Sequence, residues 1–462
     1  MELRSGHRLS LPSPHGARSS SLLNGDGVDR ISALPDDLLL QVLGRFRCAR
    51  DAARTSFVSR RWRGLWRLLP ELHFRGIAAD ALGAALGQVA PPALSLLEIY
   101  MPEKHRILDP ARLSVLLGAS ARLAPANLVL TVWGHDKDHS VPIQIPRFDR
   151  ATSMKLTVYN LTLTPPAEFP VLERLSMSGC RFDTDELVTR CPRLRVLEVL
   201  HCPVAVGTIK VHSPTIEELV VKQSGYTHCI SIMAPALKRL TMDIRVWSFF
   251  TLSCFSAPMV EEVSWECRSS YPNIGVGQWW RLHRLNLSST QNSARTLRLY
   301  IDAKTLPDTN YVPPAERSFN QHIGPLPAFS VLELYLLNGE HVFGAAVLNL
   351  LEIRSTAIRR LKISIEHHVD EESCPPECSC DQPPNWRSQS VSLVALEEVL
   401  IQGFNGTGHE IDFLKLLFRC ATRMRRMRVV LSANVLGSNR EWAEIYSIFE
   451  ENPSVKCTVY HR

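Results

Sequence analysis

Three cysteines stand close together in the run CPPECSC, at positions 374, 378 and 380, and two histidines precede them. Cysteine thiolates and histidine nitrogens are ligands that Zn²⁺ prefers, usually in a tetrahedral set of four. The spacing of Cys374, Cys378 and Cys380 differs from a C-x2-C knuckle, however, and no second pair follows at zinc-finger distance. His367 and His368 lie just upstream, and prolines flank the thiols. We interpret this segment as an exposed insertion and expect no bound metal.

Elsewhere the sequence contains no arrangement of residues that indicates catalysis. It has no Gly-rich phosphate-binding loop, no G-x-S-x-G elbow and no H-E-x-x-H motif. The 16 histidines are scattered along the chain. We therefore expect a protein that is not an enzyme and that needs no cofactor.

The composition is ordinary for a globular protein. Hydrophobic residues make up 45% of the 462 residues and charged residues 21%, which is enough apolar material for a continuous core. The net charge of +6 is small for this length and no dense basic stripe is present, so we expect no nucleic-acid partner. The longest apolar runs are too short to span a bilayer, so we expect no membrane association.

Residues 1–27 are rich in Ser, Arg, Gly and Pro and lack an apolar stretch. They predict a flexible leader and not a signal peptide. Without a secretory signal, the 12 cysteines are expected to be reduced thiols. We expect the protein to be cytoplasmic, nuclear or both.

The middle of the chain repeats itself with a period of 21–23 residues, marked by Pro170, Pro192, Pro214, Pro235 and Pro258. Apolar residues follow each proline at offsets of two, five and seven, and this spacing predicts a short strand with one apolar face. A period in the low twenties is typical of leucine-rich repeats, whose units must stack to bury that face. The pattern predicts an α/β fold: an irregular solenoid with a curved parallel sheet and with helices and loops on its convex side.

The solenoid is expected over residues 76–390, with insertions at about 302–327 and 367–390. Leu282, Leu285 and Leu287 resemble another repeat strand although no proline precedes them. The long intervals leave the number of repeats open.

Side chains between the buried positions of each strand should face the concave surface. They are mixed in charge and mostly polar, which suits a surface that binds a target protein, although solvated residues would look the same one by one. The candidate target-binding residues are Arg174, Ser176, Glu198, Glu218, Arg239, Thr241, Glu262 and Arg284.

The stretch before the repeats predicts three short helices, at 36–46, 51–57 and from Ser59 to about 69. So small a unit buries little surface, which suggests that some of its apolar side chains serve a partner. Two blocks carry a resemblance to the F-box, in its plant form: Asp29, Arg30, Ile31, Ser32, Leu34, Pro35 and Asp36, then Arg54, Thr55, Ser56, Ser59, Arg61 and Trp62. One departure lies between the first two helices, where the family often has Leu-Pro and this chain has Phe46-Arg47-Cys48-Ala49.

The resemblance covers residues 28–75 and implies that they bind a Skp-type adaptor, which connects F-box proteins to a cullin ubiquitin ligase. The repeats would then hold an unknown target protein. The residues implied in adaptor binding are Leu34, Pro35, Leu38, Leu39, Val42, Leu43, Val58 and Trp62. The excess of arginine over acidic residues in this stretch would favour an acidic adaptor.

The C-terminal part, 391–462, resembles the FBD region that often ends plant F-box/leucine-rich-repeat proteins. The matching features are Leu396-Glu397-Glu398-Val399, Gly403-Phe404, a helix over 410–420 and Asn452-Pro453. The predicted function is therefore a substrate-recognition subunit of a Skp–cullin–F-box ubiquitin ligase. Two alternatives stay open: a leucine-rich-repeat scaffold without a ligase role, and a receptor that recognises its target with the help of a small molecule.

Overall fold

The structure is a computed structural model of the 462-residue chain. It describes residues 34–89, 94–101, 108–134, 141–166, 168–203, 207–268, 275–276, 280–289, 294–303, 326–337, 341–352, 355–366, 374, 379–381, 384–433 and 439–460. The chain divides into two compact units, Met1–Leu69 and Pro70–Arg462, and each is described here by itself.

The first unit is a small helical cluster. It contains α1 (Asp36–Gly44), α2 (Ala49–Arg54) and the 3₁₀ helices η1 (Thr55–Phe57) and η2 (Leu65–Leu68). Pro35 precedes α1, and Asp36 and Asp37 lie in its first turn. Their negative charges interact favourably with the positive end of the helix dipole. The first two helices lie where the sequence predicts them.

The third helix was predicted incorrectly. The chain makes turns over residues 60–64 and then a single 3₁₀ helix, η2. Gly64 has a φ of +82°, a left-handed conformation that interrupts any α-helix through this point. Trp62, Leu65 and Trp66 are nevertheless buried, so the apolar spacing identified the core residues but not the helix type.

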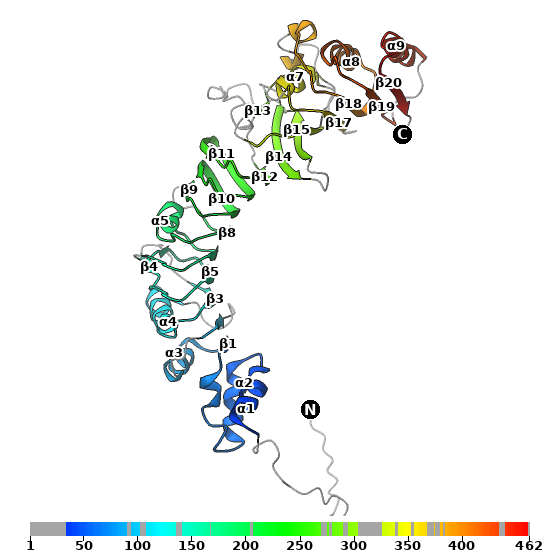
Figure 1. The fold of residues 1–462 in the computed structure, drawn as a ribbon. Coiled ribbons are helices and arrows are strands. Elements are labelled where there is room, and N and C mark those ends of the chain that lie inside the picture. Colours follow the sequence, from blue (N-terminus) through cyan, green and yellow to red (C-terminus); the bar gives the residue numbers. More distant parts are fainter. Residues whose placement is uncertain are drawn as a thin grey trace, which may run out of the picture. The chain divides into compact units, whose positions relative to one another are not determined.

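The second unit is built on one large, mostly parallel sheet (Figure 1). Its first strands are β1 (Glu71–Arg75), β2 (Leu96–Tyr100), β3 (Asn127–Trp133), β5 (Ser153–Tyr159), β7 (Arg174–Ser178), β8 (Val196–Leu200), β9 (Thr208–His212), β10 (Glu218–Met233), β11 (Arg239–Ser256) and β12 (Glu262–Arg268). The remaining strands are β13 (Gly275–Val276), β14 (Trp280–Ser289), β15 (Arg295–Ala303), β16 (Val331–Leu337), β17 (Arg360–Glu366), β18 (Glu398–Phe404), β19 (Arg426–Leu431) and β20 (Lys456–Tyr460). A separate pair joins β4 (Ile143–Gln144) to β6 (Leu163–Thr164).

Helices lie between strands in the first and last parts of the unit, on one side of the sheet (Figure 1), whereas the described residues from β8 to β16 contain no helix. The helices are α3 (Ala79–Gln88), α4 (Pro110–Arg122), α5 (Thr184–Thr189), α7 (Gly344–Glu352), α8 (Gly408–Cys420) and α9 (Asn439–Glu450), with the 3₁₀ helices η4 (Ser379–Asp381) and η5 (Pro384–Ser388). A capping box fixes the start of α8, where Thr407 and Glu410 satisfy each other's backbone. Among the helices of the described residues, none combines the length and the apolar character needed to cross a bilayer.

The periodic apolar residues form the core. Leu172, Leu175 and Met177, which define one predicted repeat, are each at most 2% exposed, and the corresponding residues of the neighbouring units are buried as well. Cys180 and Cys202 stand one repeat apart and are also buried. The predicted α/β solenoid with a parallel sheet is therefore confirmed.

One strand departs from the expected repeat. β14, which carries Leu282, Leu285 and Leu287, pairs antiparallel with both β12 and β15. The alternation of apolar and polar side chains is the same in either direction, so the pattern identifies a strand but not its direction. β15 again pairs in parallel with β16. The strand is therefore an inserted antiparallel element and not a regular repeat.

Residues 71–75, which the sequence assigns to the end of the F-box, form β1 and pair in parallel with β2. They belong to the second compact unit, because the first ends at Leu69. At the C-terminal end, strands and helices alternate in the order β18, α8, β19, α9, β20. The assignment of 391–462 to an FBD stays a prediction.

Candidate functional site

Helix α1 carries two apolar stripes. Leu39 and Leu43 are 0% exposed and fill the core of the first unit, whereas Leu38 and Val42 are each 42% exposed. Both pairs are four residues apart, so each forms its own stripe on the helix. A helix on a small domain needs only one apolar stripe for its own core. The second stripe is surface that a partner could cover.

Other apolar groups of the first unit are exposed too. Phe57, the last residue of η1, is 92% exposed, and Val58 directly after it is 70% exposed. We call Pro35, Leu38, Val42, Phe57 and Val58 the exposed apolar set. Arg61 donates to the Asp36 carboxylate at 2.8 Å and connects the turns near residue 60 to the start of α1.

The eight residues predicted to bind the adaptor fall into two groups. Pro35, Leu38, Val42 and Val58 are exposed and Leu34 is half-buried. Leu39, Leu43 and Trp62 are buried and belong to the core of the first unit. Helical spacing alone does not distinguish the exposed residues from the buried ones, because apolar residues recur at the same spacing on both stripes.

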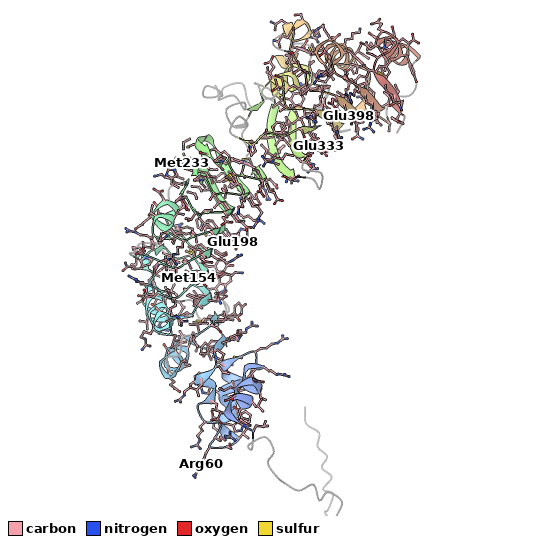
Figure 2. All side chains as sticks on the ribbon, in the orientation of Figure 1. Arg60, Met154, Glu198, Met233, Glu333 and Glu398 are labelled. Carbon is pink, nitrogen blue, oxygen red and sulfur yellow. The ribbon has the colours of Figure 1, made fainter. Side chains whose placement is uncertain are left out.

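The eight residues predicted to bind a target lie on six strands of the second unit, β7, β8, β10, β11, β12 and β14. Arg174, Glu218, Arg239 and Glu262 stand level with one another across the parallel register. Ser176, Glu198 and Thr241 form a second row, and Arg284 stands opposite Glu266. We call the side of the sheet away from the helices the open face, and Figure 2 places Glu198, Glu333 and Glu398 on it.

Opposite charges alternate along the open face. Arg239 donates to the Glu218 carboxylate at 2.5 Å, and this hydrogen bond raises the pKa of Arg239. Glu98 accepts hydrogen bonds from His73 and Arg75; burial opposes its ionisation, but these partners outweigh burial and lower the pKa of Glu98. The Arg239–Glu218 pair, and Glu98 with its two partners, therefore present paired charges on this face of the sheet.

The structure contains a cluster of stacked rings that the sequence analysis did not predict. Tyr300 and Tyr335 are register partners on β15 and β16, and their rings stack with centroids 4.5 Å apart. The Arg284 guanidinium lies over Tyr300 at 5.4 Å and the Lys362 ammonium over Tyr335 at 5.3 Å. Such cation–π contacts hold flat, amphipathic groups on the surface. We call these four residues the ring stack.

Two hollows flank the ring stack. One of about 630 Å³ is lined by Arg245, Arg268, Arg284 and Tyr300, among others. The other, of about 210 Å³, is lined by Tyr335, Lys362 and Gln402, among others. Burial, assisted by the neighbouring Glu333 carboxylate, raises the pKa of Tyr335, whose hydroxyl donates to Glu333 at 3.1 Å. The stack and hollows can receive side chains or a small polar ligand.

The cysteine-rich segment is described in part. Cys374 and Cys380 lie close to His341, which precedes α7, whereas Cys378, His367 and His368 are outside the described residues. His341 was not among the predicted candidates, because it is 33 residues from Cys374 and no motif connects them. Only the folded chain brings these groups together.

Two stretches of the chain match known protein families. Residues 31–74 match the family model of the F-box domain. Residues 118–299 match the model of the leucine-rich repeats of FBD-associated F-box protein At5g56370.

Similar curated proteins come from Arabidopsis thaliana. The F-box/FBD/LRR-repeat protein At5g56420 is 28% identical over 273 residues, which cover 53% of this chain and 61% of that protein. The F-box/LRR-repeat protein At3g26922 is 28% identical over 245 residues, covering 48% of this chain and 78% of that protein. The chain spans 58%, 49% and 58% of the length of three further relatives it matches. Residues 31–74 are therefore similar to the F-box domain and residues 118–299 to the leucine-rich repeats of an FBD-associated F-box protein, in line with the resemblance to plant F-box/FBD/LRR-repeat proteins.

Proposed function

We propose that this chain is the substrate-recognition subunit of a Skp–cullin–F-box ubiquitin ligase. The observation that carries the proposal is the second apolar stripe on α1, Leu38 and Val42, which the F-box does not use for its own core. An F-box implies a Skp-type adaptor as partner in general. The adaptor would cover this stripe and, through a cullin, bring a ubiquitin-conjugating enzyme to the target.

In this proposal the chain itself carries out no chemistry. A target lysine held near a charged conjugating enzyme reacts faster because its effective concentration is higher. The open face of the sheet would hold the target through its alternating charges and its stacked rings. We also propose a cytoplasmic or nuclear location, where cysteines such as those of this chain stay reduced.

The proposal is tested by reconstitution. The full chain is co-expressed with a Skp-type adaptor, a cullin and its RING partner, and the purified assembly is analysed by size-exclusion chromatography. We expect all four to elute together. A chain that binds the adaptor but never joins the cullin would favour the alternative of a scaffold without a ligase role.

Charge reversal on the open face is expected to weaken target capture. Lysine in place of Glu198, Glu218 and Glu262 removes three carboxylates from strands β8, β10 and β12, and at positions 218 and 262 it places like charges beside Arg239. We expect at least about a tenfold loss of target in affinity purification under proteasome inhibition, because unpaired like charges disfavour a complementary surface. Capture is quantified by mass spectrometry.

The matched control for this experiment reverses Glu186 on α5 and Glu450 on α9, which are exposed acidic residues of the helical elements. Adaptor binding should be equal in the two variants and the parent chain. Unchanged target capture after the open-face reversal would remove this surface from the proposal.

A receptor assisted by a small molecule is a second candidate, favoured by the hollow of about 630 Å³ beside Arg284 and Tyr300. This volume falls within the range of small-molecule sites, and arginines with an aromatic ring suit an anionic ligand. A thermal-shift screen of polyanionic and carboxylate metabolites distinguishes the candidates. A ligand that stabilises the parent chain but not an Arg268→Ala, Arg284→Ala variant would support assisted recognition.

A further inference from the structure

Three metal-ligating atoms converge beside the helical side of the C-terminal repeats. Cys374 Sγ lies 3.2 Å from His341 Nδ1 and 3.5 Å from Cys380 Sγ, and the three ligand atoms all lie within 4.8 Å of one another. Contrary to the expectation from the sequence, we propose that His341, Cys374 and Cys380 form a zinc-binding site that attaches the cysteine-rich segment to the repeat unit.

The spacing fits a shared ion. Zn²⁺ binds sulfur at about 2.3 Å and nitrogen at about 2.0–2.1 Å, so tetrahedral ligands lie roughly 3.5–3.8 Å apart. The separations of 3.2 and 3.5 Å are close to these values. A disulfide needs its sulfurs at about 2.05 Å, much nearer than they are here. The cluster has the geometry of coordination and not of a covalent cross-link.

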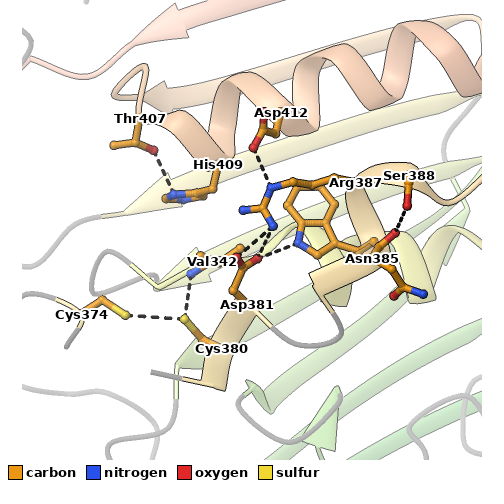
Figure 3. Close-up of polar contacts among 11 residues, drawn as sticks. Val342, Cys374, Cys380, Asp381, Asn385, Arg387, Ser388, Thr407, His409 and Asp412 are labelled. Atoms are coloured by element: carbon orange, nitrogen blue, oxygen red, sulfur yellow. Dashed lines mark hydrogen bonds and ion pairs between the residues drawn. The ribbon is translucent and has the colours of Figure 1, made fainter. Parts of the chain in front are cut away.

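The surroundings of Cys380 suit a thiolate ligand (Figure 3). The backbone N–H of Val342 donates to Cys380 Sγ at 3.3 Å, and the side chain is only 4% exposed. A backbone donor stabilises negative charge on a metal-bound sulfur. The next residue, Asp381, accepts from Trp386 Nε1 at 2.8 Å and from Arg387 Nη1 at 2.8 and 2.9 Å. These bonds fix the short helix η4 that presents Cys380.

His341, the ligand on the other segment, is positioned by an aromatic core that also contains Trp386. Phe343, two residues after His341, is fully buried and packs edge-on against Phe413 of α8, with ring centroids 5.4 Å apart. Trp386 packs against the same Phe413 at 6.5 Å and closely contacts Gly344. Arg387 also pairs with Asp412 of α8 at 2.7 Å (Figure 3). Two ligand-bearing segments far apart in sequence are thus positioned before any ion binds.

The ligand types indicate the metal. Two thiolates and an imidazole form a borderline-soft set that suits Zn²⁺ and not Mg²⁺ or Ca²⁺, which prefer oxygen ligands. His341 and Cys374 are half-buried, which leaves a route for the ion, while Cys380 is enclosed. Water or one more side chain completes four-coordination. The site has a structural role, since the ligands connect the segment to the start of α7.

The metal content of the intact chain tests the site directly. The full chain is expressed with zinc in the medium, purified under a phosphine reductant and measured by elemental analysis. We expect about one equivalent of tightly bound zinc. After chelation, Co²⁺ added to the parent chain should give the visible bands of tetrahedral cobalt and a near-ultraviolet thiolate-to-cobalt band. Zinc far below one equivalent together with no cobalt bands would overturn the proposal.

Single variants assign the ligands. His341→Asn and Cys380→Ser should each bind zinc at least about tenfold more weakly, as expected for loss of a ligand. Cys457→Ser is the matched control, because Cys457 is a half-buried cysteine on β20 outside the cluster, and it should retain the metal. Equal zinc affinity in all variants would contradict the assignment. If a variant fails to fold, the cobalt titration of the parent chain still decides.

Discussion

A chain with Leu38→Asp and Val58→Asp is expected to bind a Skp-type adaptor at least about 100-fold more weakly than the parent chain, because both aspartates would have to be desolvated in an apolar interface. The two residues are 42% and 70% exposed, so the substitutions remove less packing than a change at a buried position would. Affinity is measured by surface plasmon resonance with the adaptor immobilised. Circular dichroism should show an unchanged helix and strand content.

Two comparisons make this result specific. Val115→Asp changes a valine that is also 70% exposed but lies on α4 of the repeat unit, and it should leave adaptor affinity unchanged. Leu39→Ala changes a residue that is 0% exposed. It should lower the stability of the F-box by about 2–5 kcal/mol and reduce adaptor binding only through unfolding. Wild-type affinity in the double aspartate variant would refute the proposed interface.

The sequence predicts most of this fold because stacking repeats impose a regular pattern. A buried strand face of each repeat must carry apolar residues at fixed offsets, as Leu172, Leu175 and Met177 do, so the core can be read from spacing alone. Two features escape this reasoning. Strand direction leaves no mark on side-chain alternation, which hides the antiparallel β14. A single left-handed residue, Gly64, replaces a predicted helix by turns.

The candidate sites likewise include residues that the sequence predicts and residues that it does not. Alternation along a strand is enough to identify outward residues such as Glu198 and Arg239. The stacking of Tyr300 on Tyr335 depends on two strands becoming neighbours across an insertion, which has no periodic signal. His341 meets Cys374 for a similar reason, since a shared aromatic core holds their segments in place. Contacts of this kind depend on tertiary packing and not on local sequence.

Trp386→Ala is expected to lower the local unfolding free energy around α7 and α8 by about 3–5 kcal/mol, the range for removing a buried tryptophan. Trp386 is fully buried, its indole N–H donates to Asp381 at 2.8 Å, and the Arg387 guanidinium lies over its ring at 4.6 Å. Its ring occupies the space that any side chain at Gly344 would need. The alanine variant therefore leaves a cavity between α7 and α8 and removes a partner of Asp381.

Hydrogen–deuterium exchange of the full chain measures this effect segment by segment, which is needed because the repeats and the F-box need not unfold together. Amides of α7 and α8 should exchange roughly 100- to 4,000-fold faster in Trp386→Ala, since about 1.4 kcal/mol corresponds to a factor of ten. Trp386→Phe keeps most of the ring volume and leaves Asp381 bound to Arg387, so it should exchange much more slowly than the alanine variant. The F-box amides serve as the internal reference. Unchanged protection of α7 and α8 in Trp386→Ala would show that η5 does not support these helices, and the positioning of Cys380 would then need another cause.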